Sequence, residues 1–406
     1  MSYRIPFNRT YLVGREADYA RQAILSGRTC GDGPFTRRAQ EFLERKLAAS
    51  RVLLTTSCTV ALEMAAILCD LRPGDEVILP SYTFVSTANA IVLRGAKPIF
   101  VDIRPDTLNL DDRLIEAAIT PRTRSIWPVH YAGVACAMDE ILEIATRHRL
   151  SVVEDAAQGV YAAYKGRWLG TIGSLGCYSF HETKNFSCGE GGALVVNRTD
   201  LERRAEIVRE KGTNRSQFLR GQIDKYTWVD VGMSCVPSDI LAATLLAQLE
   251  GMETITARRR ELFETYARLL SPLERVGRIQ LPFIPADCTT NYHMFYVLTA
   301  DIDERTCLIE HLKRLGIQAT FHYVPLHTSP VGRSLGGHEG SLPVTESIAA
   351  RLLRLPLHCD MSTGDATEVA EAVIDFFTEA LVEPRGLQHG PTTSERDDAA
   401  AGSDGV

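Results

Sequence analysis

The sequence predicts an α/β fold built on a doubly wound, largely parallel sheet. From residue 51 onward, short apolar stretches rich in β-forming residues alternate with stretches of helical periodicity, which is typical of strand–helix–strand units. The chain has 406 residues, and domains usually have roughly 100–200, so we expect more than one domain. A parallel sheet places ligands beyond the carboxyl ends of its strands, and the residues there are the first candidates for a site.

The strands of this sheet are predicted in the first half of the chain. Each is a short, mostly apolar run that ends near a polar or turn-forming residue, at 52–55, 76–79, 98–101, 125–129, 151–154 and 175–179. After the first strand, apolar residues at helical spacing predict a helix that begins at residues 57–59 and extends to residue 68.

A long helical stretch at residues 238–269 leads into a second, smaller domain. Beyond it we expect a strand at 293–298 and helices near 305–315 and 365–381. We therefore divide the chain into a large domain (1–250), a small C-terminal α/β domain (251–383) and a tail (384–406). The tail is rich in Gly, Ser, Thr, Ala and Asp without periodicity, a composition that predicts disorder.

Composition and charge exclude several classes of protein. Lys and Arg number 44 against 51 Asp and Glu, and the net charge of −7 does not attract nucleic acid or an anionic membrane. No segment approaches the roughly 18–20 apolar residues of a membrane span, and the first ten residues lack a signal-peptide core, so we expect a cytoplasmic protein. The ten cysteines contain no C-x-x-C pair and the histidines lack zinc-binding spacing, so we expect structural thiols and no metal.

The most informative residues follow two of the predicted strands. Asp155 ends one strand, and Lys184 follows the next, just ahead of a glycine cluster at 189–192. This pattern indicates a site for pyridoxal phosphate (PLP), which needs a primary amine to hold its aldehyde as a Schiff base and a carboxylate to keep its ring nitrogen protonated. Lys184 is the candidate amine and Asp155 the candidate carboxylate. Gln158 could donate to the phenolic oxygen of the ring.

A phosphate cradle and a stacking residue complete the candidate site. Ser57, Cys58 and Thr59 open the helix after the first strand, where hydroxyls and backbone N–H groups suit a dianion. Ser179, at the end of another strand, is a further candidate phosphate ligand. Phe84 lies just beyond a strand and is the candidate to stack on the coenzyme ring.

Each of these assignments has a simpler alternative. Asp155 could cap a helix, and Lys184 could be a solvated surface charge. Ser57 and Thr59 could serve only as N-caps, and Phe84 could belong to the core. The coincidence of an acidic strand end, a lysine and a glycine cluster favours the coenzyme site. No G-x-G-x-x-G motif follows an N-terminal strand, so a nicotinamide-dependent sugar dehydrogenase is poorly supported.

An ordered set of motifs resembles the fold-type I PLP-dependent aminotransferases that act on nucleotide-linked keto sugars. The resemblance covers residues 5–381 and is carried by segments 33–36, 73–77, 100–102, 128–133, 154–158, 179–184 and 322–327. Segments 30–33, 81–90 and 210–218 are similar to the subgroup that aminates C4 of dTDP-4-dehydro-6-deoxy-D-glucose. The best-known members of that subgroup form dTDP-4-amino-4,6-dideoxy-D-galactose. The implied fold is aspartate aminotransferase-like, with a mostly parallel mixed sheet in the large domain.

The resemblance implies the roles given above for the coenzyme-binding residues and makes Lys184 the proton shuttle as well. It implies L-glutamate as the donor and a homodimer, or an assembly of dimers, with each site built from two chains. Many relatives supply an Asn from the neighbouring subunit where this chain has Ser234, so Asn214 or Arg215 could take over that phosphate contact. The candidates for binding the dTDP-sugar are Asn214, Arg215, Arg220, His322 and Tyr323.

Three alternatives remain for the function. One is amination at C3 of a related nucleotide-linked keto sugar. Another is a PLP-dependent sugar dehydratase, although that branch typically has histidine in place of the lysine, and Lys184 argues against it. The third is a regulatory relative with a decayed site, which the presence of Asp155, Gln158 and Lys184 disfavours.

Overall fold

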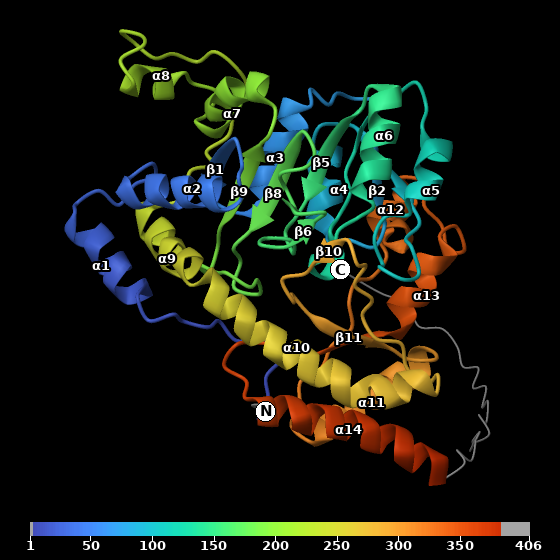
Figure 1. The fold of residues 1–406 in the computed structure, drawn as a ribbon. Coiled ribbons are helices and arrows are strands. Elements are labelled where there is room, and N and C mark those ends of the chain that lie inside the picture. The colour runs from blue at the N-terminus through green and yellow to red at the C-terminus, as the bar shows by residue number, and fades with distance from the viewer. Residues whose placement is uncertain (1–2, 383–406) are drawn as a thin grey trace, which may run out of the picture.

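A computed structural model describes residues 3–382 of the chain, and the predicted tail lies outside this range (Figure 1). The central sheet has seven strands in the order β1-β9-β8-β5-β4-β2-β3. In chain order they are β1 (Arg51–Thr55), β2 (Glu76–Pro80), β3 (Lys97–Val101), β4 (Thr123–Ile126), β5 (Ser151–Asp155), β8 (Leu175–Ser179) and β9 (Gly192–Val196). β9 is antiparallel to both of its neighbours, and the other pairings are parallel. The predicted α/β class with a mostly parallel mixed sheet is confirmed.

Side chains along each strand alternate between the two faces of the sheet, and both faces are buried under helices. Val52 and Leu54 of β1 belong to one core and Leu53 to the other, as expected when successive side chains of a strand point to opposite faces. The first core is completed by α2 (Pro34–Lys46), α6 (Met138–His148) and α9 (Asp239–Glu250). The second is completed by α3 (Cys58–Leu68), α4 (Val85–Val92) and α7 (Glu202–Arg209).

The C-terminal region forms a further core around a two-stranded antiparallel sheet of β11 (Phe295–Leu298) and β12 (Leu352–Leu355). The helices packed there are α10 (Met252–Arg275), α11 (Ile302–Arg314) and α14 (Thr363–Val382). Figure 1 shows α10 and α14 side by side below the main sheet. Ile5 belongs to this core and forms a bridge with Ile317, so the N-terminal segment packs with the C-terminal region.

The helical stretch predicted at 238–269 is two helices rather than one. α9 ends at Glu250 and α10 begins at Met252. The residue between them is Gly251, where a β carbon would lie 2.5 Å from Cγ1 of Val13. The N-terminal segment therefore passes too close to this junction for a larger residue.

The remaining elements are short or lie at the periphery. They are α1 (Glu16–Leu25), α5 (Asp112–Ile115), α8 (Arg215–Leu219), α12 (Pro330–Ser334) and α13 (Pro343–Arg351), with β6 (Ala163–Tyr164), β7 (Arg167–Trp168) and β10 (Cys288–Thr289) in a small third sheet. Single 3₁₀ turns lie at Glu116–Ala118, Tyr131–Gly133, Thr199–Leu201 and Leu326–Thr328. Within residues 3–382, no helix combines the length and the apolar character that crossing a membrane requires.

Candidate active site

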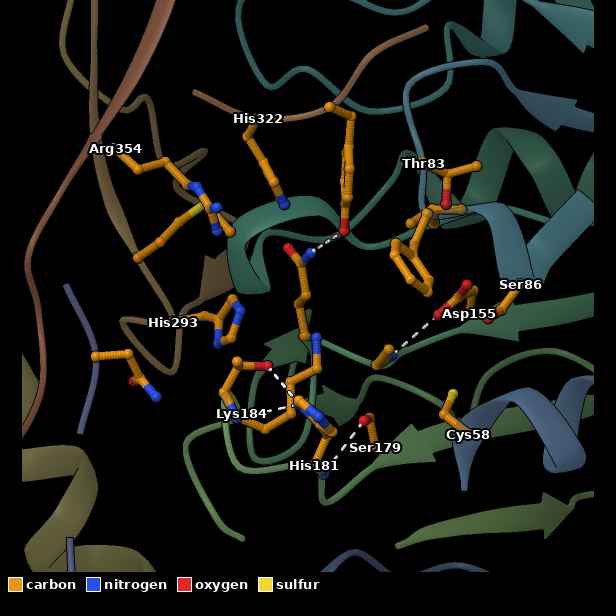
Figure 2. A pocket seen from close by; sticks show the side chains of 18 of the residues that line it. Cys58, Thr83, Ser86, Asp155, Ser179, His181, Lys184, His293, His322 and Arg354 are labelled. Carbon is orange, nitrogen blue, oxygen red and sulfur yellow. Dashed lines mark hydrogen bonds between the residues drawn. The ribbon is translucent and has the colours of Figure 1, made fainter. Parts of the chain in front are cut away.

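A cavity of about 590 Å³ lies where the carboxyl ends of the main-sheet strands face the C-terminal region (Figure 2). Every residue predicted for the coenzyme lines it, together with two of those predicted for the sugar: Ser57, Cys58, Thr59, Phe84, Asp155, Gln158, Ser179, Lys184, His322 and Tyr323. The structure therefore brings together residues from five separate segments of the sequence.

Asp155 ends β5 with its carboxylate held by two donors. The Thr87 hydroxyl donates to Oδ2 at 2.7 Å, and the backbone N–H of Ala157 donates to Oδ1 at 3.1 Å. Thr83 Oγ1 lies 2.9 Å from Thr87 Oγ1 and extends the chain of hydroxyls. Asp155 is only 5% exposed, and burial raises its pKa, whereas Thr87, Ala157 and the charge of Lys184 act in the opposite direction. A buried carboxylate is thus held in a defined orientation.

Lys184 follows β8 in a turn in which its backbone N–H donates to the carbonyl of His181 at 2.9 Å. Within the described residues, its amine has no hydrogen bond or ion pair. Burial lowers the pKa of the amine, and the nearby charge of Arg354 lowers it further, whereas Cys58 and Asp155 raise it. A lowered pKa gives a larger fraction of the neutral amine that nucleophilic chemistry requires.

The predicted phosphate cradle is the N-terminus of α3. Ser57 is its N-cap, with Oγ accepting from the N–H of Val60 at 3.2 Å, and Thr59 Oγ1 lies 2.7 Å from Ser86 Oγ. β9 passes directly against this turn, because a β carbon on Gly192 would lie only 2.3 Å from the backbone carbon of Ser57. An eleven-residue helix carries roughly half a positive charge at this end, which suits a phosphate.

Cys58 and Ser179 are the other two residues of the predicted phosphate cradle. Burial raises the pKa of the Cys58 thiol well above its usual value, so the thiol is neutral. Ser179 Oγ, at the end of β8, accepts from the backbone N–H of His181 at a long distance of 3.4 Å, which leaves the hydroxyl hydrogen free for another acceptor.

Gln158 and Tyr323 connect the large domain to the C-terminal region across the cavity. Gln158 Oε1 accepts from the N–H of Ala132 at 2.7 Å, and Nε2 donates to the Tyr323 hydroxyl at 3.0 Å. The Tyr323 ring stacks on His322 with a centroid distance of 3.5 Å. Burial and nearby cations lower the pKa of His322 well below its usual value, so the imidazole is neutral. His322 Nδ1 lies 2.8 Å from the Tyr131 hydroxyl.

The segment that carries His322 and Tyr323 is attached to the end of β2. The backbone N–H of Leu326 donates to the carbonyl of Ser81 at 3.1 Å, and the backbone N–H of His327 donates to the Ser81 hydroxyl at 3.0 Å. Ser81 Oγ also lies 2.7 Å from His327 Nδ1. These contacts keep the segment above the strand ends.

Phe84 is the predicted stacking residue, and it occupies the N-cap position of α4. It lines the cavity with 57% of its surface exposed, and its ring centroid lies 6.4 Å from that of Tyr323. One face of the ring is therefore available, and its role in stacking stays a prediction.

Three residues predicted to bind substrate do not line the cavity of their own chain. Asn214, Arg215 and Arg220 lie in or beside α8, which projects from the molecule well away from α10 and α14 (Figure 1). Arg215 pairs with Glu210 at 3.3 Å, and Arg220 pairs with Glu206 at 2.8 Å. Their place in a site stays a prediction that depends on a second chain.

Several cavity residues were not anticipated from the sequence. Three of them come from the C-terminal region: Arg259, His293 and Arg354. Thr87, which is buried behind the cavity and holds Asp155, was not anticipated either. Arg259 donates to the carbonyls of Tyr292 at 2.9 Å and of His293. A threonine inside an apolar helix and arginines in unrelated segments carry no sequence signal that places them at the strand ends.

The residues present fit PLP. An amine with no partner among the described residues, a buried carboxylate and a helix N-terminus with hydroxyl side chains line one cavity, and they match the aldehyde, the ring nitrogen and the phosphate of that coenzyme. Figure 2 shows Lys184 between the group formed by Asp155, Cys58 and Ser179 on one side and His293, His322 and Arg354 on the other.

Comparison with known proteins gives one consistent result. A model of the DegT/DnrJ/EryC1/StrS aminotransferase family matches residues 11–374. The chain is 34% identical over 374 residues to the spore coat polysaccharide biosynthesis protein SpsC of Bacillus subtilis, covering 90% of this chain and 95% of SpsC.

Solved structures agree with this result. S. venezuelae DesV, solved in complex with a ketimine intermediate, is 33% identical with a TM-score of 0.84, covering 92% of this chain and 99% of DesV. Spr1654 of Streptococcus pneumoniae, a proposed sugar aminotransferase, has been solved in PLP and PMP forms. Its PLP form is 25% identical with a TM-score of 0.86, covering 93% of this chain and 99% of Spr1654.

Proposed function

Since the chain belongs to the DegT/DnrJ/EryC1/StrS aminotransferase family and is a PLP-dependent sugar aminotransferase, we propose that it aminates C4 of dTDP-4-dehydro-6-deoxy-D-glucose. L-glutamate is the proposed donor and a dTDP-4-amino-4,6-dideoxyhexose the proposed product. The unpaired amine of Lys184, opposite the buried carboxylate of Asp155, carries the assignment of amino transfer. The similarity of segments 30–33, 81–90 and 210–218 to the C4-aminating subgroup supports the choice of carbon.

Lys184 moves the proton in both halves of the proposed reaction. When bound, PLP supplies the aldehyde that receives the amino group and the ring that accepts electrons from the reacting carbon. The neutral amine of Lys184 takes the proton from the α carbon of the amino acid, which leaves as a keto acid. In the second half the same side chain delivers a proton to C4 of the sugar. Its lowered pKa suits both directions, because a proton shuttle works best near the ambient pH.

The surrounding residues orient the reacting groups. Asp155, held by Thr87 and Ala157, would keep the ring nitrogen of the coenzyme protonated. The N-terminus of α3 would hold the phosphate, and Gln158 has a second N–H available for the ring oxygen. His322 and Tyr323 face the space above Lys184 and are the proposed contacts for the sugar.

We further propose a homodimer in which the segment around α8 reaches the partner's site. Apolar side chains of this segment are exposed in the single chain, with Trp228 76% exposed and Leu219 63% exposed. Exposed apolar residues clustered on a projecting segment are typical of a protein interface. The neighbouring Asn214 and Arg215 would then face the phosphate or the nucleotide of the second chain.

The direct test is to incubate the holoenzyme with dTDP-4-dehydro-6-deoxy-D-glucose and L-glutamate and to determine the product by NMR. We expect 2-oxoglutarate and an amino group on C4 of the sugar. An amine at C3 of a related keto sugar, with none at C4, would replace the proposal by the C3 alternative. The absence of any aminated sugar nucleotide would refute the proposed substrate.

A further inference from the structure

A histidine and a glutamate form a buried pair next to the residues that line the cavity. His130 and Glu154 are fully buried, and His130 Nε2 lies 2.9 Å from Glu154 Oε2. Glu154 directly precedes Asp155 in β5, and the backbone N–H of His130 donates to the carbonyl of Asp155 at 3.1 Å. The pair therefore lies against the strand end that carries the candidate carboxylate, although neither of its side chains lines the cavity.

The hydrogen bonds of His130 fix which ring nitrogen carries the hydrogen. The backbone N–H of Cys136 donates to Nδ1 at 3.2 Å, so Nδ1 is an acceptor and Nε2 donates to Glu154. The Glu154 carboxylate also accepts at 2.6–2.8 Å from three backbone N–H groups, those of Gly170, Ile172 and Gly173. Glu154 therefore keeps three donors when His130 is replaced, and its buried charge stays satisfied.

The imidazole of His130 closes a turn with an unusual backbone. His130 is the N-cap of the 3₁₀ turn at residues 131–133, in which Ala132 has φ 57° and ψ 17° and Gly133 has φ 75°. A non-glycine residue adopts this left-handed conformation only where the surrounding contacts hold it. The bond from Cys136 N–H to Nδ1 joins the two ends of segment 130–136 and supplies such a contact.

The left-handed residue of this turn orients Gln158. Ala132 N–H donates to the side-chain amide of Gln158 at 2.7 Å. Since a backbone N–H only donates, the amide atom that faces it is the oxygen, and the amide nitrogen faces the Tyr323 hydroxyl at 3.0 Å. Without the contact from Ala132, the Gln158 amide would be free to rotate and could present its oxygen where a donor is needed.

We propose that His130 is a positioning residue for the coenzyme, which it does not touch. It holds the turn at 131–133 so that Ala132 keeps the N–H groups of Gln158 available to the ring oxygen, an inference that rests on the proposed contact between Gln158 and that oxygen. Glu154 holds the imidazole, because its bond to Nε2 keeps Nδ1 directed at Cys136. The contact of His130 with the Asp155 carbonyl is made by the backbone, so replacing the imidazole acts on Gln158.

Pyridoxamine phosphate is the probe, because it carries the ring oxygen and forms no covalent bond with Lys184. Calorimetry on the full chain freed of coenzyme gives its Kd. We expect His130→Leu, which loses both bonds of the imidazole, to raise this Kd roughly tenfold, the size of one hydrogen bond to a charged acceptor. His130→Asn places an amide oxygen near the position of Nδ1, so it should restore most of the affinity.

A matched control separates positioning from a general loss of stability. Tyr266→Phe removes a buried hydrogen bond to the carbonyl of Pro356, at 2.8 Å in the C-terminal core, and should leave the Kd for pyridoxamine phosphate within about twofold of wild type. If His130→Leu does not fold, His130→Gln takes its place, because it keeps a donor for Glu154 and loses the acceptor for Cys136. The same increase in Kd is expected.

A double-mutant cycle tests whether His130 acts through Gln158. Gln158→Leu should raise the Kd by a similar factor, and in that background replacing His130 should add less than about twofold. Effects that multiply, or an unchanged Kd in the His130 variants, would overturn the positioning role. An unchanged Kd in Gln158→Leu would refute the contact with the ring oxygen and this inference with it. A coupled effect in a protein that aminates no sugar would refute the proposed function and leave the role of His130 standing.

Discussion

Replacing Thr87 by valine removes the hydroxyl that donates to Asp155 Oδ2 at 2.7 Å. The side chain keeps nearly the same volume, and the N–H of Ala157 becomes the remaining donor to the carboxylate. A hydrogen bond to a charged acceptor contributes about 1.5–3 kcal/mol. At 1.36 kcal/mol for each pKa unit, its loss should raise the pKa of Asp155 by about one to two units.

The shift in the pKa of Asp155 changes how the free energy of unfolding depends on pH, and this can be measured in the protein without coenzyme. Because the folded-state pKa of Asp155 lies above 3.8, the folded chain binds more protons than the unfolded chain between 3.8 and that pKa. The free energy of unfolding therefore falls as pH rises through this window. In Thr87→Val the window extends about one to two units higher. The variant also loses the hydrogen bond between Thr83 and Thr87, which lowers stability by about 0.5–1.5 kcal/mol at every pH, and at neutral pH it should be less stable by about 1.5–3 kcal/mol more.

Denaturant unfolding across a pH series measures this difference, with two variants as controls. Thr87→Ser keeps the donor and should behave as wild type. Thr83→Val removes only the hydroxyl 2.9 Å from Thr87 Oγ1, a bond between neutral groups that contributes about 0.5–1.5 kcal/mol, and its effect should be smaller. A loss of stability in Thr87→Val that is equal at every pH, or no loss at all, would show that the hydroxyl does not respond to the charge of Asp155.

The remaining predictions concern the coenzyme, the dimer and the tail. Lys184→Ala should keep its thermal stability and lose at least the roughly 10²- to 10⁴-fold that a proton shuttle contributes; wild-type turnover would refute this role. Asp155→Asn should bind PLP but transaminate far more slowly in single-turnover absorbance measurements, since an amide does not keep the ring nitrogen protonated. Mixing Lys184→Ala chains with Arg215→Ala chains should restore activity if Arg215 serves the partner's site, whereas a fully active monomer in sedimentation would contradict the dimer. Truncation after Glu383 should leave the melting temperature and the KM for the sugar nucleotide unchanged; a change in either would show that residues 384–406 contribute to the folded enzyme.

The sequence was most informative where a chemical requirement coincides with the end of a strand. Asp155, Ser179 and Lys184 follow apolar runs that are clearly bounded, and the parallel sheet brings their ends to one edge. Ser57 was placed as accurately, because a hydroxyl residue before an apolar helical stretch is an N-cap signal, and it is the N-cap of α3.

β9 was missed because it begins at Gly192, inside the glycine cluster that was interpreted only as a part of the site. Its glycine is required by the close approach to Ser57 and thus serves the strand and the cradle together. The break at Gly251 was missed because helical periodicity continues on both sides. The close approach of Val13 to Gly251 is a tertiary contact, which local periodicity does not reveal.

The residues that the C-terminal region contributes to the cavity could not be predicted from local sequence patterns, for a different reason. Arg354 lies 170 residues beyond Lys184 in the sequence, within a strand whose other residues are apolar core. Only the packing of β12 beside β11 brings its side chain to the cavity. Thr87 could not be singled out either, because its hydroxyl is one of several in the apolar helix α4 and only the tertiary fold brings it to Asp155.

The central claim is that Lys184 is the amine that holds the coenzyme opposite Asp155. Borohydride reduction of the holoenzyme makes the covalent link between amine and coenzyme permanent, and mass spectrometry of the proteolytic peptides then locates it. We predict that the coenzyme mass is found on Lys184 and that Lys184→Ala shows no labelled peptide. A label on any other lysine, or a labelled peptide in Lys184→Ala, would contradict the account.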